Sequence, residues 1–441
     1  MSEGTFFGHP RGLGVLFAAE MWERFSYYGM RAILVLYMLH VLKYPDAQAT
    51  HIYGWYTGLV WFTPLLGGLL ADHVFGTRRS IVIGGSIIAA GHFVLAIPSA
   101  AGFYPGLALV VLGTGLFKPN ASTMVGQLYQ PGDSRRDAGY TIFYMGINLG
   151  SFIAPFVCGY LAQKINWHYG FGAAGVGMVL GLITYVALRD RYLLGIGEVP
   201  RRKERAATEA EADGWPTSDE WRRIAAIIIV FVFAAAFWVS FEQAGSSLNI
   251  FADRYLNLQV GRFAIPSSWF QAAQPLFVLT FGPVFAALWQ WLARRGREPS
   301  TALKMAMGLL LVGFGYGFMI LAGRQTDACL AAHAASCAIV SPVWLLLTYM
   351  IGEWGELCLS PVGLSYVSKV APTRFVAFFM GVSFLPIAVG SYAGGWLAGL
   401  EASMPHAQFF TIFFAVSVAA GILMLFCVPQ LKRLTASVKG S

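Results

Sequence analysis

The stretch that decides the fold is residues 12–40, GLGVLFAAEMWERFSYYGMRAILVLYMLH. It is long enough to cross a bilayer as a helix, which takes about 20 mainly apolar residues. It nevertheless contains Glu20, Glu23, Arg24 and Arg31. A charged side chain inside a bilayer costs from about 2.5 to more than 10 kcal/mol, so charges in a spanning helix are expected to face protein or water and to serve a function.

Apolar stretches of this length recur along the whole chain of 441 residues. The chain is 57% hydrophobic and only 12% charged, whereas soluble domains carry about 25% charged residues. This composition excludes an ordinary soluble protein and predicts an all-α membrane protein with twelve transmembrane helices. The expected helices lie near 12–40, 51–71, 80–98, 104–129, 139–163, 170–189, 222–250, 267–293, 302–323, 341–370, 375–399 and 407–428.

A long polar stretch at 190–220 interrupts the series after the sixth apolar segment. It divides the chain into two six-helix bundles, 1–189 and 221–441, joined by a cytoplasmic linker. Two six-helix halves built from internal repeats are typical of the major facilitator fold. We therefore expect this fold, with the substrate bound near the middle of the membrane and the two halves rocking around it.

The basic residues are unevenly distributed over the ends of the expected helices. If the N-terminus is cytoplasmic, most of the 30 Lys and Arg residues face the cytoplasm. The opposite side then carries only Lys43, Lys164, Arg254, Arg262 and Arg324. Because loops rich in Lys and Arg stay on the cytoplasmic side, we expect a multi-pass protein of the cell (inner) membrane with both termini in the cytoplasm. The same distribution accounts for the net charge of +8 without a nucleic-acid partner.

Acidic or basic residues well inside the expected spans occur in only four of them. These four are the first helices of the three-helix repeats, which line the central cavity of the major facilitator fold. The charges are Glu20, Glu23, Arg24 and Arg31 in helix 12–40, Lys118 in helix 104–129, Glu242 in helix 222–250, and Glu353 and Glu356 in helix 341–370. We therefore expect these side chains to face a shared, hydrated cavity.

Acidic residues outnumber basic residues in this set by five to three. Carboxylates in a low-dielectric site disfavour one another's ionised forms, so one or two of the glutamates are expected to carry a proton at some stage. A basic group that turns to a substrate carboxylate frees its glutamate for protonation, as a proton-coupled carrier requires. Basic residues on one side of the cavity can bind a carboxylate, and acidic residues on the other side can bind an ammonium group, so the expected substrate is a small zwitterion. The alternative, structural ion pairs that only hold helices together, stays open, above all for Glu353.

Five motifs resemble, in order, those of the proton-dependent oligopeptide transporter (POT/PTR) family of the major facilitator superfamily. They are ExxERFxYYG at Glu20–Gly29, FKPN at Phe117–Asn120, FYxxINxGS at Phe143–Ser151, FEQAGS at Phe241–Ser246 and GELCLSPVGLS at Gly355–Ser365. The resemblance covers the chain from about residue 8 to about residue 400. It implies a symporter that imports di- and tripeptides together with protons by alternating access.

The resemblance also implies roles for the residues at matching positions. The implied proton-coupling residues are Glu20, Glu23, Arg24 and Glu242. The implied substrate-binding residues are Arg31 and Lys118 for the peptide carboxylate, Glu356 for the amino group or for pairing with Lys118, and Tyr27, Tyr28, Asn148, Gln274 and Trp61 as pocket walls. Two positions depart from the family pattern, since Trp61 replaces a tyrosine and Ser383 lies where a tryptophan is expected. The side-chain preference for the peptide is therefore left open.

The chain contains no nucleophile–base pair or metal-binding motif, so we expect no enzyme activity, no metal and no cofactor, with the proton gradient as driving force. The expected partners are a di- or tripeptide, protons and the lipid bilayer, and we expect a monomer. Two alternatives remain: a transporter of the same fold for nitrate or a drug-like anion, and a peptide sensor that does not transport. A disulfide between Cys329 and Cys337, which share a polar loop, is left open.

Overall fold

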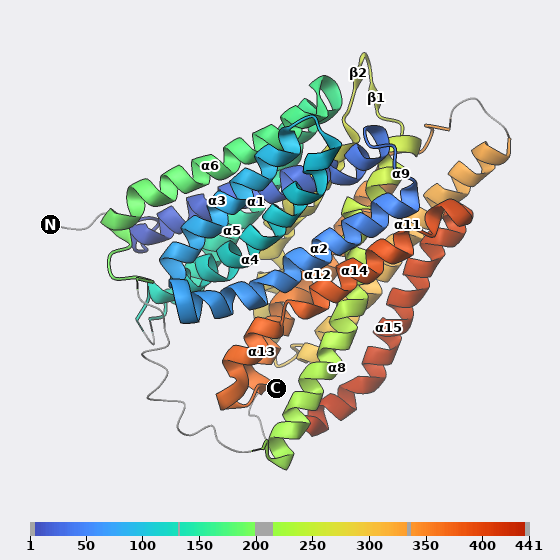
Figure 1. Cartoon of the computed structure of the whole chain (residues 1–441). Coiled ribbons are helices and arrows are strands. Elements are labelled where there is room, and N and C mark those ends of the chain that lie inside the picture. The colour runs from blue at the N-terminus through green and yellow to red at the C-terminus, as the bar shows by residue number, and fades with distance from the viewer. Residues whose placement is uncertain (1–4, 131–132, 199–214, 333–336, 437–441) are drawn as a thin grey trace. The chain divides into compact units, whose positions relative to one another are not determined.

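The computed structural model describes residues 5–130, 133–198, 215–332 and 337–436 (Figure 1). The described residues are almost entirely helical, which confirms the expected all-α membrane protein. Most of the expected linker, residues 199–214, lies outside the described residues. The division into two domains at 190–220 therefore stays a prediction.

The helices follow one another with short connections. In the first part of the chain they are α1 (Arg11–His40), α2 (Asp46–Leu70), η1 (Ala71–Phe75), α3 (Thr77–Ala96), η2 (Ala100–Gly102), α4 (Phe103–Gln127), α5 (Arg136–Tyr160), η3 (Leu161–Ile165) and α6 (Trp167–Tyr192). In the second part they are α8 (Ser218–Phe241), η5 (Glu242–Gly245), α9 (Ser247–Tyr255), η6 (Ser267–Ala272), α10 (Ala273–Arg294), α11 (Thr301–Ala331), α12 (Val343–Val370), η7 (Thr373–Phe375), α13 (Val376–Val382), α14 (Leu385–Ala398), η8 (Glu401–Ser403) and α15 (His406–Leu434). A short antiparallel hairpin, β1 (Gln259–Val260) and β2 (Phe263–Ala264), lies between α9 and η6.

Ten helical stretches within the described ranges are long and apolar enough to cross a membrane. α1 and α12 add two helices of 30 and 28 residues, which complete the twelve expected spans. These two helices carry most of the charge found inside the spans, and charge lowers their hydropathy relative to the other ten. The least apolar spanning helices are therefore also the ones expected to line the site.

The expected seventh span is interrupted where its acidic residue lies. α8 gives way to a 3-10 turn at Glu242–Gly245 before α9 begins. The Gln243 side chain stabilises this break, because its Oε1 accepts hydrogen bonds from the Ser246 and Ser247 hydroxyls at 3.1 and 2.7 Å. Its Nε2 donates to the Gly394 carbonyl at 3.0 Å. Hydropathy predicts one continuous helix here, since it does not register side-chain bonds that replace backbone bonds at a break.

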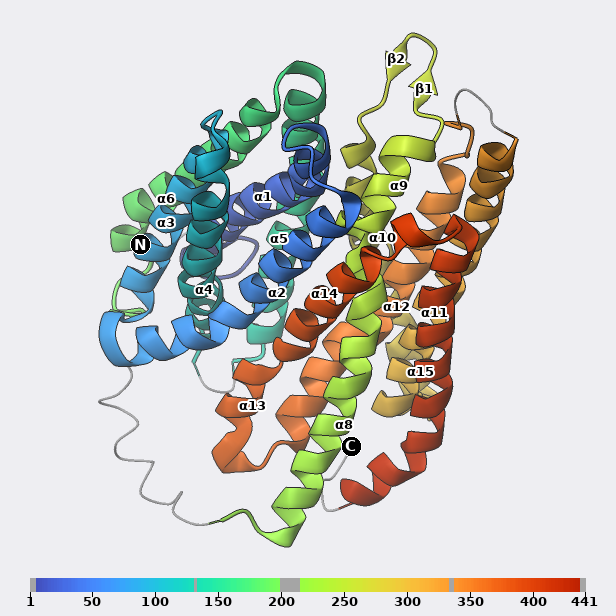
Figure 2. The same ribbon diagram turned by 45° about the vertical axis from the view of Figure 1, so that its right-hand side comes forward.

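The chain separates into two compact units by its internal contacts. The first unit comprises Met1–Tyr37 and Leu59–Glu211, and the second comprises Met38–Gly58 and Ala212–Ser441. Within the first unit α3 packs against α4 and α6. Within the second unit α11 packs against α12 and α15, and α8 packs against α14 (Figure 2).

The end of α1 and the start of α2 belong to the second unit by their contacts. Arg254, at the end of α9, donates two hydrogen bonds to the Asp46 carboxylate at 2.5 and 2.7 Å. Gly54 of α2 approaches α14 so closely that an added Cβ would lie 2.8 Å from Gly395 Cα. An ion pair and a close backbone contact thus anchor the loop between the first two spans to the second unit.

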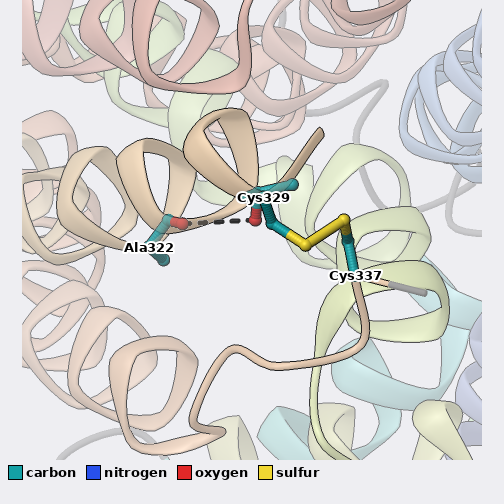
Figure 3. Close-up of a disulfide and its surroundings, with 4 residues drawn as sticks. Ala322, Cys329 and Cys337 are labelled. Atoms are coloured by element: carbon teal, nitrogen blue, oxygen red, sulfur yellow. Dashed lines mark hydrogen bonds between the residues drawn. A yellow bond between two sulfur atoms is a disulfide. The ribbon is translucent and has the colours of Figure 1, made fainter. Parts of the chain in front are cut away.

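Cys329 and Cys337 form a disulfide (Figure 3), with their Cα atoms 5.8 Å apart. Cys329 lies near the end of α11. Beyond Cys337, Val340 N donates to Tyr255 O at 3.0 Å and Asn257 N donates to Val340 O at 2.8 Å. The disulfide therefore connects the end of α11 to a segment that is itself hydrogen-bonded to the end of α9, and it settles the pairing that the sequence left open.

Reducing this disulfide should lower the free energy of unfolding by roughly 2–3 kcal/mol, because opening the loop restores conformational entropy to the unfolded chain. Thermal unfolding of the purified protein with and without a reductant measures the change. Wild type should unfold at a lower temperature in reductant, whereas the Cys329→Ser/Cys337→Ser variant should not respond. Cys427→Ser is the control, because Cys427 is a free thiol and its variant should still respond. A wild-type protein that is insensitive to reductant would contradict the prediction.

Candidate functional site

The first unit gathers a group of charged residues that we call the α1 cluster. It consists of Glu20, Glu23, Arg24 and Arg31 of α1 and Lys118 of α4. Glu20, Glu23 and Arg24 are only 1%, 0% and 1% exposed. Arg24 binds Glu23 in bidentate fashion, with Nη2 donating to Oε1 at 2.6 Å and Nε donating to Oε2. Arg24 Nε also lies 3.4 Å from Glu20 Oε1, so one arginine serves two buried acids.

Glu20 is the less neutralised acid of the α1 cluster. Its Oε2 has no hydrogen-bond partner among the residues that the structure describes. Lys118 of α4 interacts electrostatically with Glu20. The Arg24 guanidinium, in turn, lies against an aromatic ring, with its Cζ 5.1 Å from the Tyr27 ring centroid. A buried carboxylate beside a second carboxylate is favoured to bind a proton, and its protonation changes how strongly Arg24 and Lys118 are held.

Aromatic rings lie against the other two basic residues of the α1 cluster. Arg31 Cζ is 5.6 Å from the Tyr28 ring centroid. Lys118 Nζ is 3.1 Å from the ring centroid of Trp61 on α2. Cation–π attraction is strongest for tryptophan. The departure at Trp61 therefore gives Lys118 a stronger aromatic partner than a tyrosine would.

α5 packs against the part of α1 that carries the cluster. Asn148 is 6% exposed, and its Nδ2 donates to the Tyr144 carbonyl at 3.0 Å. Two residues further on, an added Cβ at Gly150 would lie 2.1 Å from the Met21 carbonyl oxygen of α1. Sequence reasoning assigned a role to Asn148 only. Gly150 is the glycine of the FYxxINxGS motif, and a glycine within a helix can indicate that another backbone lies close to it. Only the structure shows that this backbone belongs to α1.

Replacing Gly150 with Ala should reduce both stability and uptake, because α1 cannot keep its position against an added methyl group. Overpacking of this kind costs about 1–3 kcal/mol, and it displaces the helix that carries the cluster. Thermal unfolding and uptake into liposomes measure the two effects. Gly172→Ala on α6 is a matched control, since its added Cβ would lie 3.8 Å from the nearest atom, Ala96 Cβ. Equal losses in both variants would contradict the explanation by close contact.

The three acids expected at the site in the second unit are all buried, and they lie on two elements. Glu242, 4% exposed, begins the 3-10 turn between α8 and α9. Glu353 and Glu356 lie one turn apart on α12 and are 2% and 8% exposed. We call Glu353 and Glu356, with Gln274 of α10 and Ser360 of α12, the α12 cluster.

The α12 cluster is rich in carboxylate oxygens and poor in partners. Gln274 of α10 interacts with Glu353, the acid whose role the sequence left open. Glu356 interacts with Ser360 one turn further along the helix. The Oε2 atoms of both glutamates lack a hydrogen-bond partner within the described part of the chain. Two buried carboxylates at this spacing favour a proton or an ammonium group between or beside them.

A hollow that is partly open to its surroundings adjoins the α12 cluster inside the second unit. Its lining includes Ser360, Trp238 of α8, Met305 of α11, and Ser383 and Phe384 between α13 and α14. The small side chain of Ser383, at the position where the family pattern suggests a tryptophan, leaves this space open. Sequence reasoning pointed to Ser383 alone, because a lining drawn from four separate helices has no local signal.

Comparisons with known proteins agree with the motifs. The model of the POT family matches residues 78–193 and 212–417. The chain is 38% identical to the uncharacterized transporter YclF of Bacillus subtilis (strain 168), over 97% of this chain and 95% of that protein. It is 33% identical to a di-/tripeptide transporter of Lactococcus lactis subsp. cremoris, over 99% of each. A mutant of the peptide transporter POT, solved in complex with alafosfalin, is similar with a TM-score of 0.88 and 37% identity, covering 99% of this chain and 98% of that one. These similarities confirm the expected major facilitator fold, and they show that the chain belongs to the POT family.

Proposed function

We propose that the protein is a proton-coupled symporter that imports di- and tripeptides by alternating access. The observation that carries the proposal is the α1 cluster, in which one buried arginine serves two buried glutamates. A purely structural ion pair needs one acid for each base. The second acid, Glu20, has an oxygen without a hydrogen-bond partner in the described chain, which suits a proton that comes and goes.

The relatives support the substrate class. The Lactococcus lactis relative is named a di-/tripeptide transporter, and the similar solved structure is of a peptide transporter. In this chain, Arg31 and Lys118 are the groups for the peptide carboxylate, and Glu356 is the group for the ammonium end. We assign Tyr27, Tyr28, Asn148, Gln274 and Trp61 to substrate binding as well.

The coupling that we propose depends on competition for the basic residues. When Lys118 or Arg31 binds the substrate carboxylate, it interacts less with its acidic neighbours, and a glutamate gains a proton. Glu20, Glu23, Arg24 and Glu242 form the proton-coupling set. No cofactor is needed, because the proton gradient supplies the free energy.

We place the protein in the inner membrane as a monomer with both termini in the cytoplasm. The Lys and Arg distribution supports this orientation. The Cys329–Cys337 disulfide supports it independently, because the loop before α12 then faces the oxidising side of the membrane. Labelling of an engineered cysteine at Ser437 in intact cells tests the orientation, since a membrane-impermeant reagent should fail to reach it.

Reconstitution in liposomes tests the proposed function as a whole. With an inward proton gradient, labelled dialanine should accumulate, and an uncoupler should stop accumulation while exchange of labelled for unlabelled dialanine continues. Nitrate or a drug-like anion that accumulates in place of dialanine would favour a transporter of another substrate. Dialanine that binds without any flux would favour a peptide sensor.

A further inference from the structure

The connection between α10 and α11 carries three arginines in four residues, Arg294, Arg295 and Arg297. All three side chains are exposed. The nearby acid, Glu298, is already engaged, because its Oε1 accepts a hydrogen bond from Lys304 Nζ at 2.5 Å. The connection therefore presents three positive charges that its own acid does not neutralise.

Several other arginines at the ends of spans have acidic partners. The pairs are Arg78 with Asp190 and Glu198, Arg135 with Asp133, Arg254 with Asp46, and Arg374 with Glu220. None of the three arginines at the α10–α11 connection forms an ion pair with a described residue. These three charges are thus available to a partner outside the chain.

Two tryptophans indicate the level at which the α10–α11 connection lies in the membrane. The apolar span containing α10 ends at Arg294, and Trp291 is 48% exposed within its last turn. Arg295 Cζ lies 4.0 Å from the Trp291 ring centroid, and Lys304 Nζ lies 4.6 Å from the ring of Trp289. Tryptophan is enriched at the level of lipid headgroups. The arginines therefore lie where the phosphates of a bilayer are found.

We propose that the α10–α11 connection binds the phosphate headgroup of an anionic phospholipid. Guanidinium groups bind phosphate oxygens through paired hydrogen bonds, and arginine loses less hydration than lysine on doing so. Leu288, 39% exposed one turn before Trp291, offers an apolar surface to the adjacent acyl chain. The binding site is separate from the α1 and α12 clusters and does not depend on the proposed transport activity.

Removing the charge should weaken lipid binding in steps. Each basic residue near a lipid surface contributes about a fivefold gain in binding, so the triple variant Arg294→Gln/Arg295→Gln/Arg297→Gln should lose on the order of a hundredfold. Binding of phosphatidylglycerol to the full-length protein in neutral detergent, followed by native mass spectrometry and by the rise in unfolding temperature, measures this. Phosphatidylcholine should bind wild type and variant alike. Raising the salt concentration should weaken only the phosphatidylglycerol binding.

The matched control removes three basic charges from other helix ends, as Arg191→Gln/Lys432→Gln/Arg433→Gln, all of which are exposed. This control should keep nearly all phosphatidylglycerol binding. An equal loss in the control would overturn the proposal, because it would make net charge rather than this site responsible. Stabilisation by inorganic phosphate equal to that by phosphatidylglycerol would also overturn it, as would a triple variant that changes only self-association. Arg297→Gln alone, with an expected loss of about fivefold, tests the site if the triple variant fails to fold.

Discussion

Glu20→Gln should abolish proton-driven accumulation of dialanine while leaving dialanine exchange in place. An inward gradient of two pH units supports about a hundredfold accumulation for each coupled proton, because each unit is worth about 1.36 kcal/mol. The amide of Gln cannot bind and release a proton, so accumulation should fall to the level reached without a gradient. Exchange needs only substrate binding and the change of access, which the nearly isosteric Gln preserves.

Uptake and exchange in the same liposome preparation measure the two quantities separately. Glu401→Gln is the matched control, because Glu401 is a 6% exposed acid that lies outside both clusters. Its variant should accumulate dialanine as wild type does. Accumulation that survives in Glu20→Gln would remove Glu20 from the coupling mechanism. Loss of exchange together with accumulation would instead assign Glu20 to substrate binding or folding.

Arg24→Leu should produce the largest loss of stability among single substitutions in the α1 cluster. Arg24 is 1% exposed and contacts both Glu20 and Glu23. Removing one partner of a buried ion pair costs about 3–5 kcal/mol, because it leaves an uncompensated buried charge. The double variant Arg24→Leu/Glu23→Leu also removes Glu23, the acid that Arg24 binds in bidentate fashion, so it should recover part of the lost unfolding temperature while transport stays lost.

An exposed pair provides the comparison for Arg24. The side-chain and backbone hydrogen bonds from Arg135 lower the pKa of Asp133 to about 2, yet this loop pair is open to solvent. Exposed ion pairs add little to stability, so Arg135→Leu should leave the unfolding temperature nearly unchanged. If the double variant at Arg24 and Glu23 has an unfolding temperature no higher than that of Arg24→Leu, the explanation by an uncompensated buried charge is contradicted. The cost would then come from lost packing.

The charged residues of the two clusters could be found from the sequence, and their detailed partners could not. Glu20, Arg24 and Lys118 stood out because charge in an apolar stretch is rare, and helical spacing put the first two on one face. The interaction of Gln274 with Glu353 joins α10 to α12, and no local sequence pattern predicts it. The break in the seventh span could not be predicted from the sequence for the same reason, because Gln243 stabilises it partly through the Gly394 carbonyl on another helix.

Hydropathy, charge placement and motif order were sufficient to specify a twelve-helix membrane protein and its family. In a bilayer each span must satisfy its own backbone hydrogen bonds, so a spanning helix is encoded locally and can be recognised locally. Which backbone Gly150 touches, how one arginine is shared between Glu20 and Glu23, and whether Cys329 reaches Cys337 were decided only by tertiary packing. These features depend on distances of a few ångströms between groups whose approach is set by the assembled bundle.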